Sequence, residues 1–291
     1  MDSMTNNSPK PYFSIVTPNF NGMSYLPRCL RSVADQCGGD LAAEHWLIDG
    51  GSSDGSVAWL ERNHQPGYWL SETDRGMYDA INKGLERSRG TIISYLNGDE
   101  QYLPGTLRRV RDFFDRRPDV DMIFGNALLV HPNGDYIASR RGYSPHWCLI
   151  GSSQLYVLSC TMFFRRRILE AGFRFNPDWK AVGDIDFVVR VLRAGYKARH
   201  IPCFLSAFTM TGDNLGGGAK ALEELLNFRR TMPGWVRALA FPLNAARLTL
   251  KLVNGGYGSD RGMRYAVYAD NEHRERSEKV VTRTNHRWPT S

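Results

Sequence analysis

The sequence has no long apolar run and few cysteines. No stretch approaches the roughly 20 apolar residues that cross a bilayer, and residues 1–11 are polar, without the apolar core of a signal peptide. The five cysteines are odd in number, scattered and without metal-ligand spacing. Such usage does not fit a disulfide framework and fits a reducing compartment. We therefore expect a cytoplasmic chain that is not exported.

Glycine-rich phosphate motifs are also missing. No G-x-G-x-x-G follows the first predicted strand, which disfavours an NAD-linked oxidoreductase. The segment "PNFNGMSYLPR" there is not the basic glycine-rich loop that a sugar nucleotidyltransferase needs. Further along, "GDNLGGGAK" lacks the spacing G-x-x-x-x-G-K-[ST], so we interpret it as a mobile flap.

What the chain does have is 42% hydrophobic residues, enough for the core of one large α/β domain or two small ones. Apolar strands alternate with amphipathic helices over the first hundred residues, which predicts a mostly parallel sheet with right-handed crossovers. The predicted strands are "FSIVTPNF", "HWLID", "GYWLSE" and "TIISYLNGDE"; the predicted helices are Met23–Cys37, a short one from about Ser56 to Asn63, and "RGMYDAINKGLERS".

The pattern changes in the second half. We expect two strands in "DMIFGNALLVHPNGDYIASRR", one in "CTMFFRR", and a helix in "GDIDFVVRVLRAGY". The predicted organisation is a flexible N-terminus at 1–11, a domain at 12–215, a basic helical extension at 216–253, and a loose polar tail at 254–291.

Acidic turns follow two of the predicted strands. Asp49 ends the second strand within "IDGGSSDGS", and Asp99 with Glu100 ends the fourth. If neighbouring strands bring these turns together, their oxygens suit Mg²⁺ or Mn²⁺ and a diphosphate. The plainer alternatives are an ordinary Asn-Gly turn in "NGDE" and a helix cap at Ser53 or Asp54.

The chain resembles the family-two inverting glycosyltransferases with the GT-A fold. The resemblance covers roughly Phe13 to Pro202, in the family's order and spacing, and is especially close to the bacterial subgroup that builds exopolysaccharides and lipopolysaccharides. It rests on "SIVTPNFNGMSYLPRCLRSV", "LIDGGSSDGS", "SETDRGMYDAINKGLERSRGTIISYLNGDE" and "VGDIDFVVRVLRAGY". It implies a nucleotide-binding, Rossmann-like GT-A sheet with a mixed acceptor-side half.

By this resemblance, one group of residues binds the nucleotide sugar. Asp49 would bond the base, the first-strand turn would line the base and ribose pocket, and Arg75 would offset diphosphate charge; a solvated charge at a helix start is the alternative for Arg75. The full predicted donor set is Thr17, Pro18, Asn19, Asp49, Ser52, Asp74 and Arg75.

The resemblance further implies that Asp99 ligates Mg²⁺ or Mn²⁺, with Glu100 in reserve. Asn97 and Gly98 stand where the family usually carries a further aspartate, which puts the metal affinity in doubt. Ser159-Cys160 replaces a His-Gln pair, so acceptor contacts are not carried over there.

An inverting transfer also needs a base for the acceptor hydroxyl. Asp184 and Asp186 lie about 200° apart on a helix, so only one can face the site. The apolar stripe and the family pattern favour Asp184, and a helix-terminus charge is its alternative role. Trp179 and Lys180 just upstream are candidate acceptor contacts, although Trp179 is equally consistent with a core or lid residue.

Positive charge gathers at the C-terminal end. From Lys220 to Ser291 there are thirteen Lys and Arg against seven Asp and Glu, while residues 1–219 carry 24 against 23. In "LNAARLTLKLV", Asn244, Arg247 and Lys251 share one narrow helical face and apolar residues fill the rest. This predicts docking on an anionic membrane surface, with packing on the domain as the alternative. RNA-binding signatures are absent, so no nucleic-acid partner is expected.

Together with these patterns, the resemblance implies a metal-dependent, hexosyl-type inverting glycosyltransferase. It would move a sugar from a nucleotide-diphosphate sugar to a glycan or lipid-linked acceptor in bacterial surface polysaccharide biosynthesis. It would act in the cytoplasm or on the cytoplasmic face of the inner membrane. Asn97 and Gly98 leave open a relative that binds sugar nucleotides or glycans without turnover.

Overall fold

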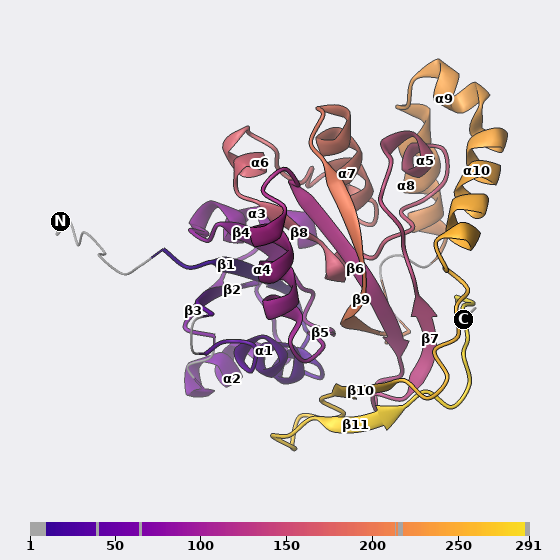
Figure 1. The fold of residues 1–291 in the computed structure, drawn as a ribbon. Helices are drawn as coiled ribbons and strands as arrows, with labels where there is room; N and C mark the ends of the chain where they lie inside the picture. Colours follow the sequence, from indigo (N-terminus) through magenta and orange to yellow (C-terminus); the bar gives the residue numbers. More distant parts are fainter. Residues whose placement is uncertain (1–9, 39–40, 64–65, 213, 215–217, 289–291) are drawn as a thin grey trace.

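The computed structural model describes residues 10–38, 41–63, 66–212, 214 and 218–288. These form a nine-stranded sheet in the order β3-β2-β1-β4-β8-β6-β9-β5, with β7 paired to β6 (Figure 1). The strands are β1 (Phe13–Asn19), β2 (Ala43–Asp49), β3 (Tyr68–Ser71), β4 (Ile92–Tyr95), β5 (Glu100–Tyr102), β6 (Met122–Val130), β7 (Tyr136–Arg140), β8 (Phe163–Arg165) and β9 (Ala198–Thr209). The helices around them are α1 (Leu26–Ala34), α2 (Ser56–Asn63), α3 (Met77–Arg87), α4 (Thr106–Arg116), α5 (Trp147–Gly151), η1 (Ser159–Thr161), α6 (Arg167–Glu170) and α7 (Gly183–Arg193).

The predicted alternation of strand and helix in the first half is confirmed. β3, β2, β1 and β4 run parallel, and helices follow the first three of them. Every residue of β1 is buried, because helices cover both faces of the sheet there. Phe13 and Ile15 pack in the cluster that contains α4, whereas Val16 packs with α3, as the two-residue period of a strand requires. The first helix is shorter than predicted, at Leu26–Ala34.

The two acidic turns do not follow neighbouring strands. β1 lies between β2 and β4, so the expectation of adjacent strands is wrong. Asn19 at the end of β1 pairs in register with Asp49 and stands between the two turns. Glu100 does not simply end a turn either, since it begins β5, which pairs antiparallel with β9.

The second half adds a mixed region to the sheet, as predicted. β6 pairs antiparallel with both β7 and β8, and these three strands match the predicted segments. β9 was missed; it is the longest strand in the described part of the chain, with 12 residues, and it lies parallel to β6. It joins β5 to the rest of the sheet and so fixes the position of the Asp99 turn.

The C-terminal region is helical and then forms a hairpin. The helices α8 (Ala219–Arg230), α9 (Gly234–Ala238) and α10 (Ala240–Val253) agree with the predicted extension. The predicted loose tail is wrong for the described residues, because β10 (Arg264–Val267) and β11 (Ser277–Val280) form an antiparallel pair. Val267 and Val281 are fully buried against Leu128 of the main sheet.

Residues 213 and 215–217 of the predicted flap lie outside the described residues. In the part of the chain that is described, no helix has the length and apolar character needed to cross a membrane.

Candidate active site

Asp49 is the centre of the turn after β2. Its Oδ1 accepts hydrogen bonds from Asn19 Nδ2 at 2.7 Å and Ser52 Oγ at 2.5 Å. Its Oδ2 accepts from Ser71 Oγ at 2.7 Å and from the backbone N–H groups of Ser52 at 2.9 Å and Gly51 at 3.1 Å. The side chain is fully buried. Asp49 therefore joins the ends of β1, β2 and β3.

These bonds decide the charge state of Asp49. Burial acts to raise the pKa of the carboxyl, but the hydrogen bonds from Ser52, Ser71 and Asn19 outweigh it and leave the pKa below its usual value. Asp49 stays ionised, with its acceptor positions largely used inside the protein. The carboxylate shapes the loop on which a nucleotide contact would depend.

The loop after β1 is tied to the loop after β2. Asn21 has a left-handed φ of 51° and accepts the N–H of Ser53, while its own N–H donates to Ser52 Oγ. Asp54 accepts the N–H of Met23 and also the N–H and hydroxyl of Ser56 at the start of α2. The helix-cap interpretation of Asp54 is thus confirmed, together with a second role in linking the loops.

The other predicted first-strand residues are buried. Thr17 is fully buried, and its hydroxyl lies 2.8 Å from His45 Nε2; Pro18 is buried as well. The residue beside them that reaches solvent is Phe20, which is 68% exposed and lies against Gly50. Phe20 was missed, although an aromatic residue directly after a buried strand was a usable signal.

Asp74, Arg75 and Lys180 come together next to this loop. Asp74 accepts the N–H of Gly76 at 2.7 Å and lies against Gly50, leaving no room for a side chain there. Arg75 is exposed and lies 3.5 Å from Asp79. Lys180 Nζ donates to the backbone oxygens of Arg75 and Pro177. The chain from β3 to α3 thus meets the segment that leads into α7.

Asp99 and Glu100 form a second acidic site. Glu100 is fully buried and Asp99 is partly exposed. Burial raises the pKa of both carboxyls, and the charges of Asp99 and Asp184 raise that of Glu100 further. Asp99 Oδ2 accepts a hydrogen bond from Asn214 Nδ2 at 3.2 Å. Two carboxylates held in this way favour a nearby cation.

The oxygen atoms of this turn suit a hard cation only in part. Asn97 Oδ1 and Glu100 Oε1 are buried and accept no hydrogen bond from the described residues. However, no three His, Cys, Asp or Glu side chains of the described residues converge as metal ligands. The protein side of such a site therefore provides one or two carboxylates, the arrangement typical of Mg²⁺ held together with substrate phosphates.

Asp184 lies in the first turn of α7. Its Oδ1 accepts the N–H of Ile185 at 2.8 Å and lies 3.4 Å from the hydroxyl of Tyr78. Ser159 also hydrogen-bonds the carboxylate. The residue is partly exposed, yet burial of its carboxyl raises the pKa to about 6. A carboxylate with such a pKa can take up a proton near neutral pH.

The ring of Tyr78 explains why the residue before Asp184 is a glycine. A Cβ atom on Gly183 would lie 2.6 Å from Cε2 of Tyr78, whose ring is buried. Asp186 is on another side of the helix, where it pairs with Arg190 at 2.8 Å. The two aspartates therefore lie on different sides of α7, as their spacing predicts.

Trp179 packs more into the protein than toward solvent. Its ring meets Phe228 of α8 edge to face, with 6.3 Å between the centroids. Next to it, Glu224 of α8 accepts the N–H groups of Lys180 and Ala181 at 2.7–3.0 Å. These contacts favour the core alternative for Trp179 and leave Lys180 as the exposed candidate.

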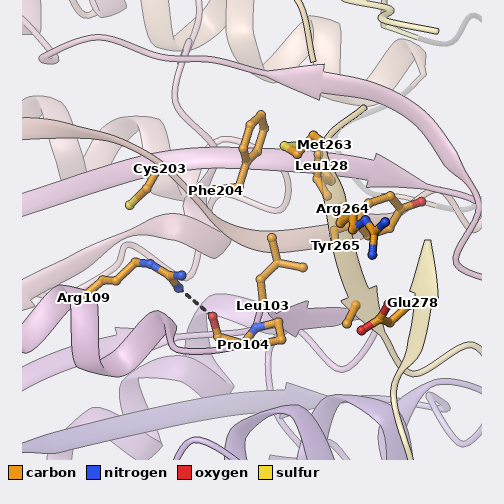
Figure 2. A pocket seen from close by; sticks show the side chains of 11 residues that line it. Leu103, Pro104, Arg109, Leu128, Cys203, Phe204, Met263, Arg264, Tyr265 and Glu278 are labelled. Atoms are coloured by element: carbon orange, nitrogen blue, oxygen red, sulfur yellow. Dashed lines mark hydrogen bonds between the residues drawn. The ribbon is translucent and has the colours of Figure 1, made fainter. Parts of the chain in front are cut away.

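A cavity of about 350 Å³ lies away from these residues. It is formed where the β5–α4 junction, β9 and the β10–β11 hairpin meet, and Figure 2 shows Arg109 bonded to the oxygen of Pro104 at one side of it. It contains none of the predicted site residues. This cavity is therefore not the candidate active site.

Comparisons with known proteins identify the class to which this sheet and its acidic turns belong. The model of the family "Glycosyl transferase family 2" matches residues 14–173. An uncharacterized glycosyltransferase of Mycobacterium tuberculosis is 39% identical over 206 residues, covering 69% of this chain and 76% of its own. A PGL/p-HBAD biosynthesis glycosyltransferase of Mycobacterium bovis is 29% identical over 190 residues, covering 62% and 69%. The chain belongs to glycosyl transferase family 2.

Solved structures agree on the fold. Staphylococcus aureus TarS, crystallised with UDP-GlcNAc, superposes with a TM-score of 0.61 at 17% identity over 83% of this chain and 72% of its own. A mannosyltransferase of Pyrobaculum calidifontis, in complex with GDP-Man and Mn²⁺, gives a TM-score of 0.54 at 17% identity over 84% and 76%. The predicted GT-A type of fold is confirmed.

Proposed function

We propose that the protein is an inverting glycosyltransferase that moves a hexosyl group from a nucleotide-diphosphate sugar to a glycan or lipid-linked glycan. The proposed setting is the biosynthesis of a bacterial surface polysaccharide. The observation that carries the proposal is Asp184: a carboxylate at a helix start, aligned by Tyr78 and Ser159, with its pKa raised to about 6. Solved relatives that bind UDP-GlcNAc or GDP-Man support a donor of this class.

The donor is proposed to bind across the ends of β1, β2 and β3. Asp49 and Ser52 hold the loop in shape, and Phe20 offers an exposed ring on which a base can stack. Asp74 lies against Gly50, and Arg75 beside it carries the positive charge for the diphosphate.

A divalent ion, Mg²⁺ or Mn²⁺, fits the acidic turn. Asp99 would ligate it with Glu100 beside it, and phosphate oxygens of the donor would complete its ligands, because too few side chains converge there. When bound, the ion supplies positive charge against the departing diphosphate.

Asp184 is proposed as the base of a single displacement. The acceptor hydroxyl oxygen forms a bond to the anomeric carbon while the bond from that carbon to the diphosphate oxygen breaks. The hydroxyl proton passes to Asp184 Oδ, and the nucleoside diphosphate leaves with the electron pair. Attack opposite the leaving group inverts the anomeric configuration. Asp186 is paired with Arg190 and takes no part.

The acceptor is proposed to approach past Lys180 from the side of α7 and α8. Lys180 is exposed beside the Asp74–Arg75 loop, whereas Trp179 supports this wall through Phe228. A lipid-linked acceptor would place the enzyme at the cytoplasmic face of the inner membrane.

Screening sugar nucleotides for thermal stabilisation, with and without Mn²⁺, tests the proposal. We expect one donor to raise the Tm in a Mn²⁺-dependent manner, and the same donor to be hydrolysed or transferred. The anomeric configuration of the product, measured by NMR, should be inverted. Stabilisation without any turnover would support the alternative of a binding protein, and retention of configuration would contradict the role of Asp184.

A further inference from the structure

Helix α10 packs on the protein through its polar side. Asn244 Oδ1 accepts the hydroxyl of Ser153 at 3.2 Å, and the backbone oxygen of Arg247 accepts the hydroxyl of Tyr143 at 3.0 Å. Lys251 Nζ lies 4.4 Å from the centroid of Tyr257. No residue of α10 is fully buried. Apart from Leu243, which packs partly against the core, the usual arrangement of an amphipathic helix, apolar face inward, is therefore reversed.

The apolar side of α10 faces outward. Phe241, Leu248 and Leu252 are spaced seven and four residues apart, so they lie on one stripe, and Phe241 is 86% and Leu252 67% exposed. On α9, Trp235 and Leu239 are exposed as well. In Figure 1, α9 and α10 form the outer edge of the molecule, at the opposite end from the β10–β11 hairpin. Contiguous apolar surface of this kind marks an interaction site.

The charge in this stretch of the sequence has one sign. Residues 225–259 contain no Asp or Glu and five basic residues, Arg229, Arg230, Arg237, Arg247 and Lys251. Arg230 and Arg237 are exposed. An apolar stripe with an interfacial tryptophan and basic neighbours complements an anionic lipid surface. The 14 residues of α10 span only about 21 Å, less than the ~30 Å hydrocarbon core, so the helix suits lying along the interface.

We infer that α9 and α10 dock flat on an anionic bilayer, with Phe241, Leu252 and Trp235 entering the boundary between head groups and acyl chains. The inference deepens the proposed function, on which it rests for the lipid-linked acceptor, by naming the surface that meets the membrane.

The same surface is connected to the catalytic side. α5 contacts both α10 and α7. Trp147 of α5 meets Trp235 edge to face, with 5.5 Å between the ring centroids. Arg193 of α7 lies over the ring of Trp147, 5.4 Å from its centroid. Docking therefore holds α7, which carries Asp184, at a defined position relative to the bilayer.

Sedimentation with vesicles tests the inference without donor or acceptor. The full chain should sediment with vesicles of phosphatidylcholine and phosphatidylglycerol in equal parts, and much less with phosphatidylcholine alone. Phe241→Glu should weaken this binding by at least about tenfold, because it removes the exposed aromatic ring that would enter the bilayer and adds a repelled charge. The control is Val280→Glu on β11, an apolar residue that is 51% exposed and undergoes the same charge change; it should bind as the wild type does.

Three sedimentation results would overturn the inference. They are failure of the wild-type chain to sediment with anionic vesicles, equal binding by Phe241→Glu, and equal loss in Val280→Glu. Light scattering of the same samples tests whether the surface instead binds a second copy of the chain. A wild-type dimer that Phe241→Glu converts to a monomer would also contradict membrane docking. Thermal stabilisation by donor, measured on the same variants, reports the proposed function separately.

Discussion

The ring of Tyr78 fills the space in which a side chain at position 183 would lie. Any Cβ there would come within 2.6–2.8 Å of three ring carbons, and the same Tyr78 places its hydroxyl 3.4 Å from Asp184. Tyr78 belongs to α3, and its ring stacks on that of Phe175 with the centroids 5.7 Å apart. The glycine before Asp184 is thus required by the packing that orients the carboxylate.

Gly183→Ala should both destabilise the protein and slow transfer. Forcing a methyl group against a buried ring costs about 1–3 kcal/mol, and displacing Tyr78 disturbs Asp184. Differential scanning calorimetry and the transfer rate measure the two effects. Gly67→Ala is the matched control, because a Cβ on that exposed glycine meets no atom within 4 Å. If both variants lose the same activity, the packing argument fails.

Asp184→Asn should cut transfer by at least about 10²-fold, the low end for loss of a general base. The amide is similar in size and still accepts the N–H of Ile185, so folding and donor affinity should persist. Asp186→Asn, which loses only the contact with Arg190, should retain most activity. Transfer kinetics measure the loss of rate, and calorimetry measures donor affinity. A fully active Asp184→Asn enzyme would show that Asp184 is not the base.

The rate of transfer should rise with pH and level off above about 6. Asp184 must be ionised to accept a proton, and burial raises its pKa to about 6. Below that pH the rate should fall toward tenfold per pH unit. Because the hydrogen bond from Tyr78 lowers the pKa, Tyr78→Phe should move this limb to higher pH. A limb that stays in place in Tyr78→Phe would show that another group sets it.

The same shift predicts a stability change of definite sign. A pKa raised from 3.8 to about 6 means that the folded chain binds more protons than the unfolded chain between these values. The contribution of Asp184 to stability is therefore full below about pH 4 and is lost as the pH rises through 6. Relative to wild type, Asp184→Asn should be more stable at pH 8 than at pH 4, by about 1–3 kcal/mol. Urea unfolding at both pH values measures the difference.

Asp49→Ala should weaken donor binding and also destabilise the sheet. The substitution leaves the buried amide of Asn19 and the half-buried hydroxyls of Ser52 and Ser71 without their acceptor. The cost is about 1–3 kcal/mol for a fully buried group left unsatisfied and less for the hydroxyls. Asp54→Ala, whose carboxylate is exposed, should cost less. Urea unfolding and calorimetry with nucleoside diphosphates separate stability from affinity. A variant with wild-type stability would contradict the structural role found here.

Asp99→Ala should abolish the Mn²⁺-dependent part of thermal stabilisation by donor. The buried turn then lacks its partly exposed carboxylate, the one that can reach both ion and phosphate. Glu100→Ala should reduce that part less, although it also removes the acceptor for the N–H of Asn97. Continued enhancement by Mn²⁺ in Asp99→Ala would show that the ligand has been misassigned.

The sequence by itself determined the strand and helix order of the first half and the side on which each residue falls. Periods of 2 and 3.6 are local, so Val16 and Ile15 separate to opposite faces, and Asp184 separates from Asp186, without knowledge of the rest of the fold. The motifs that carry the family resemblance lie in these segments, and the family followed from them.

Only the tertiary structure decided how distant segments meet. β9 pairs with β5 and β6, which lie far away in the sequence. The β10–β11 hairpin forms its own two-stranded sheet and packs against Leu128 of β6, a contact that its short strands do not predict. The adjacency of Asp99, Glu100 and Asp184 likewise depends on pairings along β9 and β6 that no local pattern encodes.

Helix α10 shows the limit most clearly. Its sequence determines that Asn244, Arg247 and Lys251 share one face, but not that this polar face turns inward. That choice depends on partners from elsewhere in the chain, the hydroxyls of Tyr143 and Ser153, because a polar face can be covered only where its hydrogen bonds are supplied.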